Sequence, residues 1–251
     1  MSGGRAAPRG DAVVWDYDGT LVSTEEKNFG VTRAIVERVT SRPAGGFEAL
    51  ASPASYRAAL ARSRNWREFY ARSFGLAEAE IDRAGLLWTE YQLGDATPTP
   101  LVAGIPEVLR SLRHLPHGIV SQNASGAIAA VLDGHGLRGC FRSIIGFEEV
   151  DIRRQKPEPD GLLKCVEILT AARPGTVFYI GDHETDAVCA ARARAVLLAR
   201  KAGVRIVSIA ALYGSDSEPR WSVQPDHAVH RPCDIAEVVM RYAAPPPAPE
   251  A

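Results

Sequence analysis

The chain has 251 residues, of which 46% are hydrophobic and 24% are charged, which suits one sizeable globular domain or a domain with a smaller insertion. Its 29 basic and 30 acidic residues give a formal net charge of −1, a balance that favours neither nucleic acid nor a membrane surface as partner. No apolar run approaches the roughly 18 residues of a membrane helix, and no apolar signal-peptide core stands near the start. We therefore expect a cytoplasmic protein, whether monomer or dimer.

The first predicted strand covers residues 12–16 and leads into a long interval that is mostly helical. Ser23 and Glu26 have the spacing of a capping box, and a later helical pattern ends at Gly75. We expect residues 24–97 to form a small helical cap. Because ligands of open α/β sheets bind beyond the carboxyl ends of the strands, an insertion at this point should cover the binding edge. Its aromatic residues are expected to form its core: Trp66, Phe69, Trp88 and Tyr91.

Strands and helices alternate along the rest of the chain. The further strands are predicted over 117–121, 142–146, 176–182 and 204–212, and the helices over 106–114, 124–136, 159–169 and 185–203. Thr185 is a possible N-cap of the last helix. Several strands are near-continuous apolar runs, which is typical of parallel strands covered on both faces. The alternation predicts an α/β fold, namely a doubly wound parallel sheet with a Rossmann-like core.

The predicted organisation is a core interrupted by the cap, with a tail at each end. Both ends of the chain lack apolar periodicity and are predicted to be disordered, the second one being Pro-rich. The boundaries are 1–10 for the first tail, 11–23 and 98–243 for the catalytic core, 24–97 for the cap and 244–251 for the second tail.

The stretch WDYDGTLVS, residues 15–23, places Asp16 and Asp18 directly after the first strand. An Asp-Gly pair such as Asp18-Gly19 is a common turn signal, so an ordinary surface turn is one interpretation. The other is a reaction centre in which one carboxylate attacks a substrate while its neighbour moves a proton.

Polar residues at the ends of the other predicted strands favour a reaction centre. Ser121 ends the second strand, Lys156 follows the third, and Asp182 and Asp186 follow the fourth. The carboxyl ends of parallel strands converge on one edge of the sheet. A turn that arose by chance would not need these remote partners.

Together the motifs WDYDGTLV, IVSQN, QKPEPDG and YIGDHETD, each after its predicted strand, resemble those of the haloacid dehalogenase superfamily. The resemblance covers roughly residues 12–242. It is to the Mg²⁺-dependent phosphatases with a helical cap after the first strand, and the layout is most similar to that of phosphoglycolate phosphatases. Dehalogenases of the superfamily lack the aspartate found here at position 18, so Asp18 favours phosphate-ester chemistry.

The resemblance implies a role for each motif residue. Asp16 would be the nucleophile that forms an aspartyl-phosphate, and Asp18 would be the general acid and then the general base. Ser121 would donate a hydrogen bond to the phosphoryl oxygens, and Lys156 would supply positive charge. With backbone N–H groups included, the implied phosphate-binding residues are Gly19, Thr20, Ser121, Gln122, Asn123 and Lys156.

The resemblance also implies a magnesium ion. Four carboxyl groups around an anionic phosphate would repel it unless a hard cation such as Mg²⁺ offset their charge. The family pattern assigns the metal to Asp16, to the backbone carbonyl of Asp18, to Asp182, and to Asp186 as a further or water-mediated ligand.

We therefore expect a phosphatase that hydrolyses a small phosphorylated metabolite of the phosphoglycolate or sugar-phosphate type. Two other interpretations remain. A phosphosugar mutase of the same superfamily would use the same motifs but return the phosphoryl group to a second hydroxyl. A non-catalytic binding or regulatory protein would have kept the fold alone.

Overall fold

The computed structural model describes residues 10–63, 65–213 and 221–242. Its strands are β1 (Ala12–Trp15), β2 (His117–Val120), β3 (Phe141–Ile145), β4 (Gly175–Gly181), β5 (Val204–Ala211) and β6 (His227–Val229). They form one parallel sheet in the order β3-β2-β1-β4-β5-β6. The predicted doubly wound α/β fold is confirmed, and β6 is an addition to the predicted strands. The tails predicted at 1–10 and 244–251 lie, apart from Gly10, outside the described residues.

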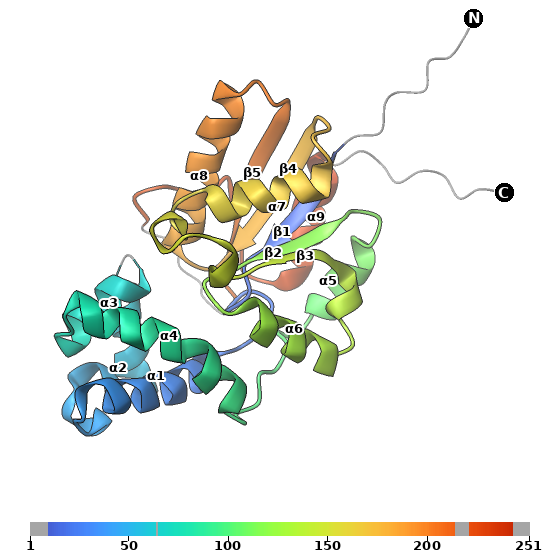
Figure 1. Ribbon diagram of the computed structural model, residues 1–251. Coiled ribbons are helices and arrows are strands. Elements are labelled where there is room, and N and C mark those ends of the chain that lie inside the picture. The colour runs from blue at the N-terminus through green and yellow to red at the C-terminus, as the bar shows by residue number, and fades with distance from the viewer. Residues whose placement is uncertain (1–9, 64, 214–220, 243–251) are drawn as a thin grey trace, which may run out of the picture.

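Strand β1 shows why the sheet is covered on both faces (Figure 1). Val13 and Trp15 belong to a hydrophobic cluster with helices α5 (Ile105–Ser111), α6 (Ser125–Gly134) and α9 (Pro232–Tyr242). Ala12 and Val14 belong to a second cluster with α7 (Asp160–Thr170) and α8 (Glu184–Ala199). Successive side chains of a strand point to opposite faces, so a strand that is apolar throughout needs helices on each side.

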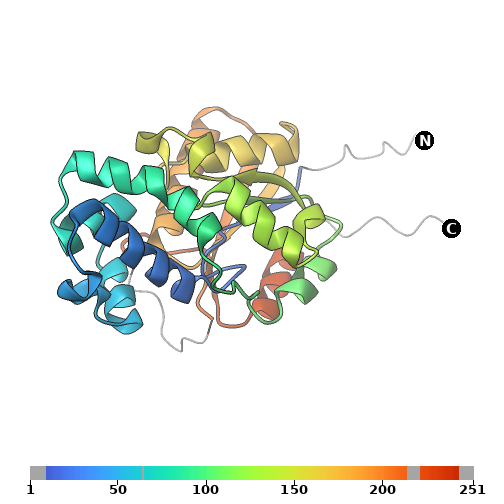
Figure 2. The same ribbon diagram turned by 60° about the horizontal axis from the view of Figure 1, so that its bottom comes forward.

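Four further α-helices of the described residues lie between β1 and α5 in the chain and are called the helical insertion here. They are α1 (Glu25–Thr40), α2 (Pro53–Ala61), α3 (Trp66–Phe74) and α4 (Glu78–Gly94). They enclose their own hydrophobic cluster, in which the ring of Phe69 packs edge-to-face against Tyr56 and Phe74. Trp66, Trp88 and Tyr91 pack against this cluster, as expected from the sequence. Figures 1 and 2 show the helical insertion beyond the edge where the strands end, with α4 passing next to α6.

The start of α1 differs from its prediction. The capping box expected at Ser23 does not form, because α1 begins after Thr24 and this N-cap makes no side-chain capping bond. The Thr24 hydroxyl instead accepts a hydrogen bond from the side-chain amide of Asn28 at 3.2 Å. The same side-chain amide of Asn28 also donates to Asp18 of the first motif.

Two other helix ends test the sequence signals. Helix α3 ends at Gly75 as predicted, with a φ of 69° that favours glycine. Helix α8 is capped by His183, whose Nδ1 accepts the N–H of Thr185 at 3.2 Å, so the predicted N-cap at Thr185 is wrong by two residues.

Among the described residues, no helix combines the length and hydropathy of a membrane span. The short 3₁₀ turns are 44–46, 48–50, 138–140, 147–149 and 152–154.

Candidate active site

Three carboxylates meet where the order of the strands reverses. The chain passes from β1 to β2 and β3 on one side and returns to β4 on the other side of β1, and such switch points are where open α/β sheets bind ligands. Asp16 directly follows β1, Asp182 directly follows β4, and Asp186 lies in the first turn of α8. One oxygen from each of these carboxylates lies within 4.8 Å of the others.

Lys156 is buried against this carboxylate cluster. Its Nζ pairs with Oδ1 of Asp16 and lies 2.8 Å from Oδ1 of Asp186. Burial alone would lower the pKa of Lys156, but the two carboxylates outweigh burial and raise it, which keeps the ammonium charged. The side-chain amide of Gln122 donates to the carbonyl of Lys156 at 2.9 Å and so fixes the loop that carries it. Tyr179 completes the cluster, because its hydroxyl donates to Oδ1 of Asp186 at 2.8 Å.

One lysine does not balance this acidic cluster. Burial raises the pKa of Asp16 to about 7, although Lys156 lowers it, and Asp186 and Asp18 add to the rise. The pKa of Asp182 is raised well above its usual range by burial and by Asp16 and Asp186. The negative charge of these carboxylates therefore exceeds the positive charge that Lys156 supplies. A hard cation that prefers oxygen ligands fits this set of donors.

Asp18 lies in a different environment from Asp16, although one residue separates them. Its Oδ1 accepts hydrogen bonds from Nδ2 of Asn28 at 3.1 Å and of Asn123 at 3.4 Å, and its Oδ2 accepts from the hydroxyl of Ser121 at 3.4 Å. Its side chain is outside the three-carboxylate cluster. Neutral donors therefore surround Asp18, whereas a buried lysine and two further acids surround Asp16.

Gly19 allows the motif loop to lie against the end of β4. Its φ is 77°, and a Cβ at this position would come within 2.2 Å of Oδ2 of Asp182. Its N–H donates to the carbonyl of Val22 at 2.8 Å and closes the turn. Any side chain at this position would displace Asp182, which explains sterically why a glycine stands here.

The structure divides the predicted site residues into two groups. Asp16, Asp182, Asp186 and Lys156 form the carboxylate cluster, while Asp18, Ser121 and Asn123 form a neighbouring polar group. Gln122 positions Lys156, and Thr20 is fully buried with no partner for its hydroxyl among the described residues.

The backbone N–H groups assigned to the phosphate cradle are partly engaged elsewhere. The Gly19 N–H closes its turn, and the Asn123 N–H donates to the Ser121 hydroxyl at 3.0 Å. These two N–H groups would therefore have to break their present hydrogen bonds before they could donate to a phosphate.

The helical insertion supplies residues to the site that were not among the predicted site residues. The side-chain amide of Asn28 in α1 donates to Asp18, and Oδ1 of Asn28 accepts from the side-chain amide of Gln92 in α4 at 2.6 Å. The Trp88 indole of α4 donates to Oδ1 of Asn123 at 3.3 Å. Asn28 lies just beyond the quoted motif, and its place in the first turns of the next helix was the available signal.

A wide cleft leads to Lys156 from the side of the helical insertion. Its volume is about 900 Å³, and Gln122 and Lys156 are among its lining residues. Arg67 lines the same cleft and pairs with Glu78 and Asp82, so its charge is already compensated. The cleft thus reaches Lys156, whereas Asp16, Asp182 and Asp186 are not among its lining residues.

Comparison with known proteins agrees with this geometry. A family model described as haloacid dehalogenase-like hydrolase matches residues 11–194. The chain belongs to the haloacid dehalogenase-like hydrolases, which confirms the resemblance of the four motifs.

Individual relatives extend the match. The chain is 28% identical over 185 residues to a phosphoglycolate phosphatase of Cereibacter sphaeroides, covering 71% of this chain and 79% of that protein. A solved structure of a candidate phosphoglycolate phosphatase from Lactobacillus plantarum has a TM-score of 0.68 at 21% identity, covering 90% of this chain and 98% of that one. A predicted phosphatase from Clostridium acetobutylicum has a TM-score of 0.68 at 15% identity, with coverages of 92% and 98%. These two structures support the fold.

Proposed function

We propose that this protein is a Mg²⁺-dependent phosphatase that hydrolyses a small phosphate ester through an aspartyl-phosphate on Asp16. Membership of the hydrolase family and the phosphoglycolate phosphatase among its relatives support this function. The observation that carries the mechanism is the contrast between Asp16, paired with buried Lys156, and Asp18, surrounded by neutral donors. Adjacent carboxyl groups divide acid and nucleophile roles when their environments differ in this way.

In the first step an oxygen of the Asp16 carboxylate attacks phosphorus, and the bond from phosphorus to the leaving oxygen breaks. Asp18, as the carboxylic acid, gives its proton to that leaving oxygen. Lys156 neutralises charge at Asp16 and keeps its carboxylate oriented. The alcohol product then leaves.

In the second step water attacks the phosphorus of the aspartyl-phosphate, and Asp18 takes the proton of that water. The bond between phosphorus and the Asp16 oxygen breaks, and inorganic phosphate is released. Asp18 is thereby returned to its protonated state. The Ser121 hydroxyl contacts Asp18 and lies where it would orient this residue or donate to the phosphoryl oxygens.

The carboxylates of Asp16, Asp182 and Asp186 would hold the magnesium ion together with the backbone carbonyl of Asp18. When bound, the ion offsets the negative charge of this cluster and polarises the phosphoryl group. The raised pKa values of Asp16 and Asp182 support the need for such a cation.

Residues 24–97 would act as the cap. Asn28 and Trp88 link the helical insertion to Asp18 and Asn123, so closure would complete the surroundings of the acid. A closed cap would also exclude bulk water during the first step.

Phosphate release from a panel of phosphometabolites tests the proposal. The purified protein should release inorganic phosphate with Mg²⁺, and EDTA should abolish the release. If the protein converts sugar phosphates into their isomers and releases little phosphate, the mutase interpretation replaces the phosphatase proposal. A panel without turnover under either condition would contradict an active enzyme.

A further inference from the structure

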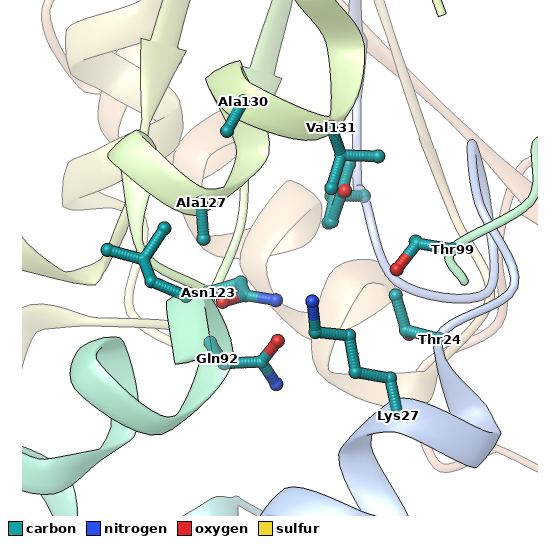
Figure 3. A pocket seen from close by; sticks show the side chains of 10 residues that line it. Thr24, Lys27, Gln92, Thr99, Asn123, Ala127, Ala130 and Val131 are labelled. Carbon is teal, nitrogen blue, oxygen red and sulfur yellow. The ribbon is translucent and has the colours of Figure 1, made fainter. Parts of the chain in front are cut away.

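A buried lysine of the helical insertion has no counter-charge among the residues that the structure describes. Lys27, in the first turn of α1, is only 9% exposed. Its ammonium makes no ion pair or hydrogen bond with any residue that the structure describes. Figure 3 shows its nitrogen directed into a cavity of about 180 Å³ between α1, α4 and α6. Burying an unpaired charge is costly, so this position favours an anionic ligand.

The rest of the cavity wall carries no compensating acid. Its other lining residues are neutral: Tyr17, Thr24, Gln92, Leu93, Thr99, Asn123, Ala127, Ala130 and Val131. In the wider cleft Arg67 and Arg192 are paired with carboxylates, and the third arginine of its lining, Arg153, is exposed to solvent. Among the residues that line the two spaces, the buried cation without a counter-charge is therefore Lys27 of the smaller cavity.

A second polar group at this cavity also lacks a partner. The Thr99 hydroxyl is buried and makes no hydrogen bond among the described residues, and Figure 3 shows it on the same side of the cavity as Lys27. The Thr99 carbonyl interacts with Nε2 of His135 at 2.9 Å, which holds the segment in place. An ammonium and a hydroxyl that face one small space suit the two oxygens of a carboxylate.

The cavity adjoins the proton donor of the proposed reaction. Asn123 forms part of the cavity wall, and its Nδ2 lies 3.4 Å from Oδ1 of Asp18. Thr24 and Gln92, also in the wall, both bond to Asn28, which in turn donates to Asp18. Asp18 is not itself among the lining residues, but the side chains of Asn28 and Asn123 link it to the cavity wall.

We propose that Lys27 and Thr99 bind a carboxylate on the leaving group, so that the substrates are short phosphorylated hydroxy acids. This proposal rests on the proposed phosphatase function. The volume is below the roughly 300–1,000 Å³ of sites for drug-sized ligands, which limits the leaving group to a few carbons. A second phosphate would bring more negative charge than one lysine offsets, and the geometry therefore favours a carboxylate.

Two substrates that differ mainly in the carboxylate test the subsite. For 2-phosphoglycolate, Lys27→Met should lower kcat/KM by about 10- to 100-fold, mainly through KM, because it removes a charged hydrogen bond. For 2-hydroxyethyl phosphate, which lacks the carboxylate, the same variant should stay within about twofold of wild type. Lys201→Met, which alters an exposed lysine just after α8, should leave kcat/KM unchanged for both substrates. Equal losses on both substrates, or no loss on either, would overturn the proposal.

Two further measurements are needed. The Tm of the variants distinguishes a folding defect from loss of the subsite, and glycolate binding tests the subsite even if the protein is not a phosphatase. Lys27→Met should not lower Tm, because it removes an unpaired buried charge, and Lys27→Arg should retain the preference for the carboxylate substrate. If the wild-type protein releases no phosphate from any ester, the proposed function fails, but glycolate still tests the cavity. Glycolate should then raise the Tm of wild type and Lys201→Met but not that of Lys27→Met, and ethylene glycol should raise none. Glycolate shifts that are equal in all three proteins, or absent from all, would refute the site.

Discussion

The sheet edge and the helical insertion hold their buried lysines in opposite ways. Lys156 at the sheet edge pairs with Asp16 and Asp186. Lys27 of the helical insertion is almost as buried but has no partner among the described residues. The charge of a paired lysine is already compensated before a ligand binds. The charge of an unpaired buried lysine is compensated only when an anion binds, so this lysine favours anion binding more strongly. The contrast suggests that the sheet edge supplies the reaction and the helical insertion supplies selectivity.

The two regions also differ in how they are built. The strands of the sheet are packed between helices on both faces, while the helical insertion has a separate aromatic core. Side-chain hydrogen bonds from Asn28, Trp88 and Thr89 connect it to the core. Such a connection is compatible with opening and closing of the insertion over a fixed reaction centre.

The largest expected effect is at Asp16. Asp16→Asn removes the attacking oxygen and should reduce phosphate release by about 10⁴-fold or more. Steady-state kinetics with 2-phosphoglycolate measures it, and Asp133→Asn, at an exposed position of α6, is the matched control. If Asp16→Asn retained activity comparable to the control, the sheet edge would not be the reaction centre.

Asp18 should show a loss that depends on the leaving group. Asp18→Asn should reduce kcat by about 10²–10⁴-fold for an alkyl phosphate, because its leaving oxygen needs a proton. The loss in the first step should be smaller for p-nitrophenyl phosphate, whose leaving group is stable as an anion. Burst kinetics separates the two steps. A loss of equal size for both leaving groups in the burst phase would argue against an acid role for Asp18.

The separate core of the helical insertion predicts a local loss of stability. Phe69 is 1% exposed and contacts three other aromatic rings, so Phe69→Ala should cost about 3–5 kcal/mol. Hydrogen exchange should show reduced protection in α1–α4 with little change in β1 and β4. Phe178→Ala, in the buried centre of β4, should affect the sheet instead. Uniform loss of protection in both variants would show that the two regions unfold as one unit.

His117 should make the sheet sensitive to acid. Burial lowers its pKa to about 4, and its Nδ1 accepts a hydrogen bond from the Trp15 indole at 3.0 Å. The unfolded chain, with a histidine pKa near 6.5, binds more protons between these values. The stabilisation is therefore present above about pH 6.5 and is lost as pH falls towards 4, up to about 3 kcal/mol.

Urea unfolding as a function of pH checks this prediction. His117→Gln should flatten the dependence between pH 4 and 6.5 relative to wild type. His114→Gln, which changes an exposed histidine on the same segment, should leave it unchanged. An identical slope in wild type and His117→Gln would contradict a neutral buried histidine.

The fold was predictable where local patterns are strong. The apolar runs of the first five strands and the glycine that ends α3 follow from neighbouring residues, and all are confirmed. Strand β6 has three residues, too few to show a period. The cap of α8 was misplaced because a histidine can accept from a backbone N–H as a hydroxyl does.

The candidate site was predictable to the extent that its residues lie at strand ends. Strand topology brings Asp16, Asp182 and Lys156 together, and their motifs mark them. The contribution of the helical insertion depends on contacts between distant segments, such as Trp88 with Asn123, which no local pattern reveals. Lys27 is harder still, since a lysine in the first turn of a helix is usually solvated and only the packing of α4 and α6 buries it.

The most direct test of the account is to trap the covalent intermediate. Wild-type protein would be mixed with 2-phosphoglycolate and Mg²⁺, quenched in acid within a turnover, digested and mapped by mass spectrometry. The proposed mechanism predicts the mass of one phosphoryl group on the peptide that contains Asp16. Fragmentation should confine that group to Asp16, and it should be absent from Asp16→Asn. Full turnover with that peptide unmodified at every quench time, or a phosphoryl group on another residue, would contradict it.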